Sequence, residues 1–167
     1  SIFKTIYNIY YIRNKNLFKK IIMNKIIKVK YKNKIFAIII KNENLRKKGI
    51  TFFTENKMNL QVGFMKHPRG HKILPHKHYP VRRVLKKSSE AIYIIKGELR
   101  VDFYTNKEGY LFSKVIKSKS IIILMDGAHG FKVSKNIEMI EVKQGPFIKQ
   151  IDKKKFPPID EKKIKYK

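Results

Sequence analysis

Short runs of β-branched and aromatic residues, each bounded by Asn, Gly, Pro or Lys, follow one another from Ile26 to Lys143. Few stretches show helical periodicity, so the pattern predicts strands. Many short strands at spacings of about eight to twelve residues are typical of a β-sandwich or barrel. The expected strands are 26–31, 34–40, 60–66, 71–77, 90–95, 98–104, 110–116, 120–125, 129–133 and 137–143.

The chain length sets how many such domains the sequence can hold. A chain of 167 residues is long enough for one domain with its own core and too short for two ordinary ones. We place this domain at residues 23–150. The tail at 151–167 has lysine runs, a pair of prolines and little apolar surface, which predicts a lysine-rich mobile segment.

Residues 1–22 differ from the rest of the sequence. They carry five basic residues and no acid, and polar residues interrupt every apolar run, so we expect neither a signal peptide nor a membrane span within them. We interpret them as a disordered or non-native extension, such as upstream sequence read in frame before the start-like tripeptide at 23–25. The alternative is a basic amphipathic helix that lies on a membrane.

Lysine dominates the charge of the chain. The formal net charge is +28, and 34 lysines stand against 6 arginines, without an arginine-rich patch of the kind that favours phosphate recognition. A/T-rich codons encode Lys, Ile, Asn, Tyr and Phe, which supply 92 of the 167 residues. We therefore attribute the charge to compositional bias more than to selected nucleic-acid binding. Such a surface should still bind polyanions non-specifically at low salt.

The sequence contains no cysteine, which excludes disulfides, thiolate metal sites and a cysteine nucleophile. Any metal must therefore be bound through nitrogen and oxygen, and we expect a cytoplasmic protein.

Three of the five histidines occur in a pattern that suits a metal ion. Side chains alternate between the faces of a strand, so His76 and His78 would point to the same side. Glu90 begins an apolar run, where a carboxylate is costly unless a positive partner meets it. His129 follows turn residues that predict a hairpin bringing a third imidazole inward. The alternative for the first histidine pair is a solvated loop.

This set resembles the first motif of the cupin family, which runs glycine, five residues, His-x-His, a gap, glutamate, six residues and glycine. The matching positions here are Gly70, His76, His78, Glu90 and Gly97. His129 matches the single histidine of the second motif. The resemblance covers about residues 63–145. Within the family it is similar to a small group of uncharacterised bacterial single-domain cupins, some associated with surface-polysaccharide biosynthesis.

Two features depart from the family pattern. Residues 79–89 make the gap between the second histidine and the glutamate longer than usual, and the gap contains Arg82 and Arg83. The Pro-x-Gly that precedes the histidine of the second motif is absent. The two arginines could bind a phosphate or carboxylate of a substrate. Their alternative is a solvated surface.

The resemblance implies an all-β fold, the double-stranded β-helix of a cupin jelly roll or barrel. It also implies one divalent ion, iron, manganese, nickel or zinc, bound by His76, His78, Glu90 and His129. Open coordination positions would accept water, dioxygen or a chelating substrate. Single-domain cupins are often homodimers, so we expect strands within Ile26–Ile40 to pair across a two-fold axis.

Three functions compete at this point. The first is a metal-dependent enzyme acting on a small polar or anionic substrate such as a sugar or nucleotide sugar, with isomerase, epimerase and oxygenase reactions open. The second is a non-catalytic sugar-binding or sensing module with a structural ion. The third is a non-specific nucleic-acid-associated protein, which only the charge motivates.

Overall fold

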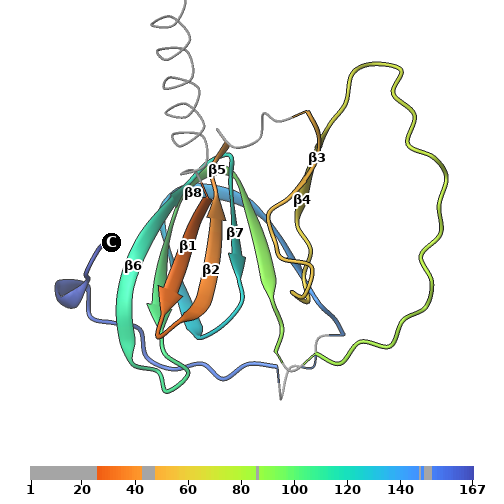
Figure 1. Ribbon diagram of the computed structural model, residues 1–167. Coiled ribbons are helices and arrows are strands. Elements are labelled where there is room, and N and C mark those ends of the chain that lie inside the picture. The colour runs from red at the N-terminus through yellow and green to blue at the C-terminus, as the bar shows by residue number, and fades with distance from the viewer. Residues whose placement is uncertain (1–25, 43–47, 86, 147, 149–151) are drawn as a thin grey trace, which may run out of the picture.

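The computed structural model of the chain (Figure 1) describes residues 26–42, 48–85, 87–146, 148 and 152–167. The amino-terminal extension expected at 1–22 lies outside these residues. The fold is all-β, and apart from one 3₁₀ turn at Glu161–Lys163 its described elements are strands. They are β1 (Ile26–Tyr31), β2 (Lys34–Ile40), β3 (Gly49–Phe52), β4 (Gly63–Lys66), β5 (Glu90–Tyr104), β6 (Tyr110–Lys117), β7 (Ser120–Leu124) and β8 (Ala128–Lys143).

One curled antiparallel sheet forms the body of the domain (Figure 1). Its order is β1-β2-β7-β5-β6, and β8 pairs with β5 along nearly the whole length of both strands. Val29 of β1 and Phe112 of β6 belong to the same buried cluster, although these strands stand at opposite ends of the sheet order. The sheet therefore curls into a half-barrel around a core.

The two faces of β2 and β7 bury different apolar clusters, as side-chain alternation requires. Ile39 and Ile122 face the inside of the curl with β5 and β6 residues such as Phe103. Ile38 and Ile123 face outward and pack with Phe53 and the residues that follow it. The small β3–β4 sheet and its connecting loop therefore cover the outer face of the half-barrel (Figure 1).

The longest strands are bent ribbons rather than pairs of separate strands. The expected strands 90–95 and 98–104 are one strand, β5, and 129–133 and 137–143 are one strand, β8. The register shifts between Ile94 and Leu99, where Gly97 has φ 90°. A Cβ at Gly97 would lie 2.1 Å from the carbonyl oxygen of Asn136, so the predicted turn residue instead allows two strands to bend together.

Three other strand predictions need correction. Residues 71–77 have an extended path but no ladder partner among the described residues, and β3 was not predicted because Gly49–Phe52 is short. The segment 60–66 forms a strand only from Gly63. The turn before His129 also does not make a hairpin. β7 pairs with β2 and β5, whereas β8 starts opposite Tyr104 at the other end of β5.

The carboxyl-terminal residues 152–167, for which composition alone predicts mobility, make contacts with β5 and β6. The amide of Ser113 donates to the carbonyl of Lys165 over 2.8 Å, and Tyr166 forms a parallel bridge with Ser113. The amide of Ile159 donates to the hydroxyl of Tyr104 over 3.0 Å. Lys154 pairs with Glu108 and Phe156 packs on Tyr104, so basic and apolar residues of the tail both contact the sheet.

No helix in the described part of the chain has the length and apolar character that a membrane crossing needs.

Candidate functional site

The two ends of the β5–β8 ribbon meet inside the half-barrel. Glu90 begins β5 opposite Lys143 at the end of β8, whereas His129 lies near the start of β8 opposite Phe103. Because the ribbon bends at Gly97, its ends approach each other, and His129 Nε2 lies 3.1 Å from Glu90 Oε2. The two side chains are 27% and 21% exposed, so the pair is accessible but shielded from bulk water.

The electrostatics of the pair favour the ionised carboxylate. The hydrogen bond from His129 holds the pKa of Glu90 below its ordinary value of 4.5, and burial opposes this shift without reversing it. The positive charges of Lys143 and Lys153 lower the pKa of Glu90 further. Glu90 is therefore a carboxylate at neutral pH, which is the state that binds a cation.

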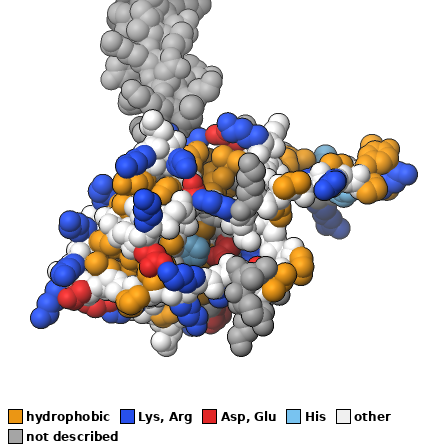
Figure 2. All heavy atoms as spheres, turned by 90° about the horizontal axis from the view of Figure 1, so that it is seen from below, with side chains coloured by type: hydrophobic (Ala, Val, Ile, Leu, Met, Phe, Trp, Pro, Cys, Tyr) orange, Lys and Arg blue, Asp and Glu red, His pale blue; other side chains and the backbone are white. Residues whose placement is uncertain are grey.

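A cavity of about 1230 Å³ opens beside this pair. Ile92, Leu124 and Phe131 give it an apolar wall, and the tail residues from Asp152 to Phe156 close one side. Seen from below, the hollow holds histidine, acidic and basic side chains together (Figure 2). Six of the chain's 12 acidic residues line it: Glu90, Asp102, Asp126, Glu141, Asp152 and Glu161.

The cavity lining contains a larger fraction of acidic residues than the chain as a whole. Six Lys and Arg residues line the same cavity, so its formal charge is balanced although the chain carries +28. A bias toward A/T-rich codons would not place half of the carboxylates in one hollow. This concentration marks the cavity as the part of the molecule suited to a polar ligand.

The separation of Glu90 and His129 suits a shared metal ion. Two ligands at ~2.1 Å from one ion and at a right angle stand about 3 Å apart, close to the 3.1 Å between Nε2 and Oε2. An imidazole and a carboxylate fit Zn²⁺, Fe²⁺, Mn²⁺ or Ni²⁺. The pair thus fits as half of the expected ligand set.

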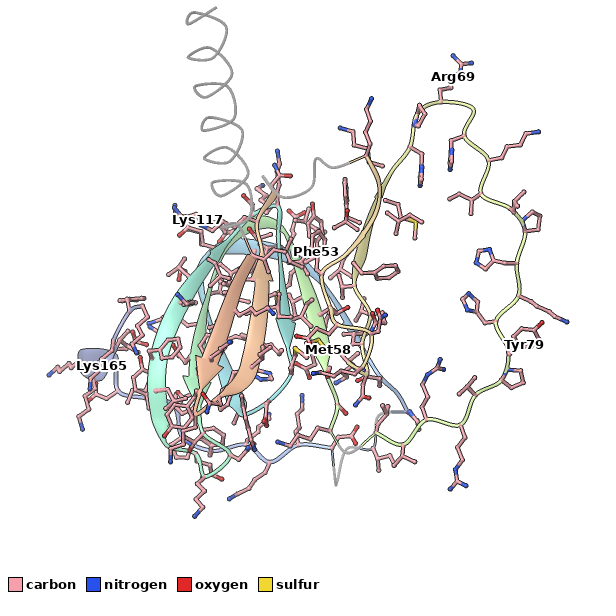
Figure 3. The ribbon with its side chains drawn as sticks, in the orientation of Figure 1. Phe53, Met58, Arg69, Tyr79, Lys117 and Lys165 are labelled. Atoms are coloured by element: carbon pink, nitrogen blue, oxygen red, sulfur yellow. The ribbon has the colours of Figure 1, made fainter. Side chains whose placement is uncertain are left out.

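The other two expected ligands lie elsewhere. His76 and His78 stand on residues 67–85, here called the outlying segment, which runs out from the domain between β4 and β5 (Figures 1 and 3). Their ring centroids are 5.3 Å apart. Among the described residues, no group of three or more His, Asp or Glu side chains gathers closely enough to hold an ion. The structure therefore brings together Glu90 and His129 but not all four residues.

The local geometry of the two histidines still suits metal binding. Nδ1 of His76 lies 3.0 Å from the carbonyl oxygen of Leu74. A carbonyl oxygen can only accept a hydrogen bond, so the proton lies on Nδ1. The lone pair of Nε2 is then available to a metal ion. The ring spacing of His76 and His78 also allows both rings to reach one ion, since each centroid would lie ~3 Å from it.

Arg82 and Arg83, the predicted substrate-binding residues, lie on the outlying segment and are exposed. They do not line the cavity. Sequence reasoning instead missed a cation beside the cavity, because Arg100 and Asp102 looked like ordinary members of an apolar strand. Arg100 Nε lies 2.9 Å from Asp102 Oδ1, and both side chains are buried. Two opposite charges at alternate positions of a buried strand were the available signal.

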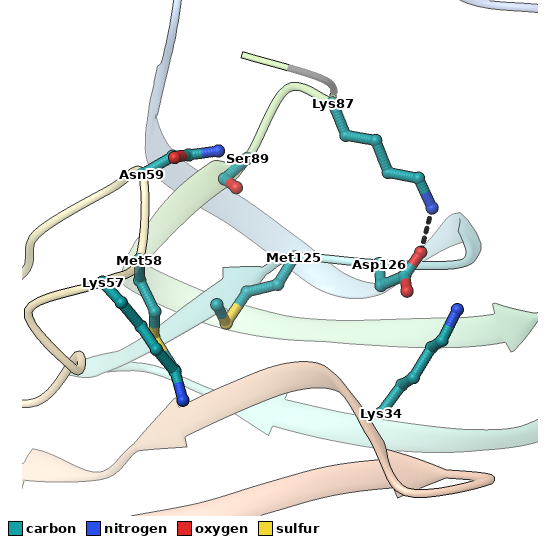
Figure 4. A pocket seen from close by; sticks show the side chains of 8 residues that line it. All are labelled: Lys34, Lys57, Met58, Asn59, Lys87, Ser89, Met125 and Asp126. Atoms are coloured by element: carbon teal, nitrogen blue, oxygen red, sulfur yellow. Dashed lines mark hydrogen bonds and ion pairs between the residues drawn. The ribbon is translucent and has the colours of Figure 1, made fainter. Parts of the chain in front are cut away.

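An ion pair and a hydrogen bond hold the residues just before the start of β5 in place. Lys87 pairs with Asp126, and both line a smaller neighbouring cavity of about 360 Å³ (Figure 4). The side-chain oxygen of Gln144 accepts from the amide of Ser89 over 2.7 Å. These contacts hold the residues just before Glu90, so the carboxylate starts from a fixed position.

Comparisons of the chain with protein-family models, with curated proteins and with solved structures found no match.

Proposed function

We propose that this protein is a metal-binding cupin that acts on a small polar or anionic molecule held in the cavity of the half-barrel. Glu90 and His129 would supply two ligands of one divalent ion, and His76 and His78 the other two. The observation that carries the proposal is the contact of Glu90 with His129, which faces a cavity of about 1230 Å³. When bound, the ion supplies Lewis-acid chemistry or a site for dioxygen.

The unpaired edge of β8 supports the jelly-roll part of this proposal. β8 is 16 residues long and has β5 as its partner within the described sheet, so its other edge can accept a strand. A jelly roll needs further strands at this position, and the outlying segment contains the expected strand at 71–77. The chain between Lys66 and Glu90 can span about 80 Å when extended, so its length permits this docking.

Different residues of this chain have different roles in the proposed site. The Glu90 carboxylate balances part of the charge of the ion, and the walls from Ile92, Leu124 and Phe131 exclude water from one side of the ligand. The balanced charge of the lining suits hydroxyl-rich or zwitterionic groups as well as anions, which keeps sugars and nucleotide sugars as the first substrates to test. Docking of the outlying segment would also bring Arg82 and Arg83 toward this ligand.

Metal analysis tests the proposal directly. Protein purified without a histidine tag should contain nearly one transition-metal ion per chain, as measured by inductively coupled plasma mass spectrometry. His76→Ala and His129→Ala should each lose most of it, whereas the matched control His71→Ala should retain it. Metal-free wild-type protein with an intact circular-dichroism spectrum would sink the proposal.

A second measurement separates an enzyme from a module with a structural ion. Manganese-loaded protein with an exchangeable water in its coordination sphere would enhance water proton relaxation, as an open site does. Thermal shifts with a panel of sugars and nucleotide sugars then identify the ligand class. A closed sphere together with sugar binding would favour the non-catalytic module.

A further inference from the structure

The outlying segment exposes more apolar surface than an isolated loop tolerates. Leu74, Tyr79 and Val84 are 77%, 74% and 74% exposed. The hydrogen bonds and ring contacts found for residues 71–84 stay within residues 67–79. Large apolar side chains exposed to this degree mark a binding segment. The segment is therefore built to be covered by something else.

Exposed apolar side chains also lie on both faces of β8. Val133, Ile140 and Val142 are 53%, 53% and 55% exposed, and the edge of this strand away from β5 has no ladder partner in the described sheet. An extended segment that adds to a free sheet edge gains main-chain hydrogen bonds and pockets for alternate side chains. The shape of β8 thus matches an extended chain of the kind that the outlying segment presents.

The charge of the cavity beside β8 also permits contact with the outlying segment. The outlying segment carries cations, among them Arg69, Lys72 and Lys77, and no acidic residue between 67 and 85. The cavity beside β8 holds half of the acidic residues of the whole chain. Six cations balance these carboxylates, so the cationic segment meets less repulsion at the cavity than on the rest of a chain that carries +28.

We infer that the outlying segment of one copy docks along the free edge of β8 of a second copy, and the reverse, so that two copies share two metal sites. The inference rests on the proposed function. Each site would combine His76 and His78 of one protomer with Glu90 and His129 of its partner. Each protomer supplies one segment and one edge, which satisfies the symmetry of a two-fold dimer.

The path of the segment is the reason for assigning it to a second copy. Its ends are fixed at β4 and β5, and between them it runs away from the half-barrel rather than back along its own β8 (Figures 1 and 3). Exchange of such an arm uses the contacts that a single chain would use and adds the apolar surface of the partner.

Complementation between two defective copies tests this arrangement. One copy carries His76→Ala and His78→Ala, the other Glu90→Gln and His129→Ala, and each carries a different tag without histidine. Tandem purification after joint refolding isolates the mixed dimer. We expect about one metal ion per mixed dimer, about two per wild-type dimer and none in either parent, since only one mixed site is intact. Mixed dimers without metal, beside metal-loaded wild type, would overturn the exchange and leave the proposed function standing.

Crosslinking gives a reading that does not depend on metal, even if wild-type protein binds none. The chain has no cysteine, so Leu74→Cys in one copy and Val133→Cys in the other supply a unique pair for a short bismaleimide. Joint refolding should give a covalent dimer that carries both tags. Absence of this product, or a monomer in light scattering at micromolar concentration, overturns the inference. A monomer that binds anionic phospholipid vesicles through the segment would assign the apolar surface to a membrane instead.

Discussion

Arg100 Nη1 lies 2.7 Å from Glu161 Oε2, so a guanidinium in β5 binds a residue that follows 61 positions later in the chain. The Arg100 side chain is 6% exposed and also pairs with buried Asp102. Glu161 itself is largely exposed and receives a second cation from Lys132. Glu161 thus attaches the tail to the sheet through the buried guanidinium of Arg100.

Replacement of Arg100 should destabilise the domain strongly. Arg100→Met keeps the length of the side chain but leaves the Asp102 carboxylate buried without its cation. We expect the free energy of unfolding to fall by about 3–5 kcal/mol, the usual effect of breaking a buried pair on one side. Urea unfolding followed by circular dichroism measures the change. Glu161→Gln is the control and should have a much smaller effect, because its partner charge stays paired with Asp102. Equal effects would contradict the assignment.

Docking of the tail should survive mild acid. The hydrogen bond from Arg100, with help from Lys132, lowers the pKa of Glu161 from 4.5 to about 2. A lowered pKa stabilises the docked state above pH 4.5, and this stabilisation is lost as the pH falls toward about 2. The amide NMR signal of Ile159, which binds Tyr104, reports docking across this range. In Glu161→Gln this carboxylate transition should vanish, and an unchanged titration would refute the assignment.

Removal of the His129 imidazole should raise the pKa of Glu90. The hydrogen bond from His129 is the largest cause of the lowered pKa, while burial acts in the opposite direction and remains in His129→Ala. Carbon-13 NMR of labelled glutamate in metal-free protein measures this pKa. Val133→Ala, elsewhere on β8, is the control and should leave it in place. A Glu90 pKa that does not move would mean that the two side chains do not meet in solution.

The two motif glycines should differ sharply in their tolerance of alanine. A Cβ at Gly97 would lie 2.1 Å from a carbonyl oxygen, whereas a Cβ at Gly70 meets no atom within 4 Å. Both residues have positive φ, so both variants are strained. We expect a loss of roughly 3 kcal/mol for Gly97→Ala and about 1 kcal/mol for Gly70→Ala in thermal unfolding. A similar loss in both would show that the bend is not tightly packed.

Local periodicity predicted most of the sheet but could not reveal how its strands continue. The alternation in 90–95 and in 98–104 was visible, yet the bend at Gly97 depends on contact with Asn136, which is distant in sequence. The same holds for β8, where a register shift replaces the expected break. Strand type follows from side-chain pattern, whereas strand continuity follows from pairing between distant segments.

The sequence predicted some parts of the candidate site and missed others. Glu90 and His129 meet as the metal hypothesis requires, although the route is the folded ribbon rather than a hairpin. The full four-residue ligand set stays a prediction, because His76 and His78 lie on the outlying segment. The role of Glu161 was hidden because the composition of its tail masks a single well-placed carboxylate.

The neutrality of the cavity changes what the charge of +28 means for this protein. Six cations and six carboxylates cancel within the cavity, so the whole excess lies on the rest of the chain. Two copies therefore approach each other as polycations, while a small ligand meets a site without net charge. Added salt should weaken the repulsion between copies far more than it affects ligand binding. Ionic strength would then act as a selective control of assembly.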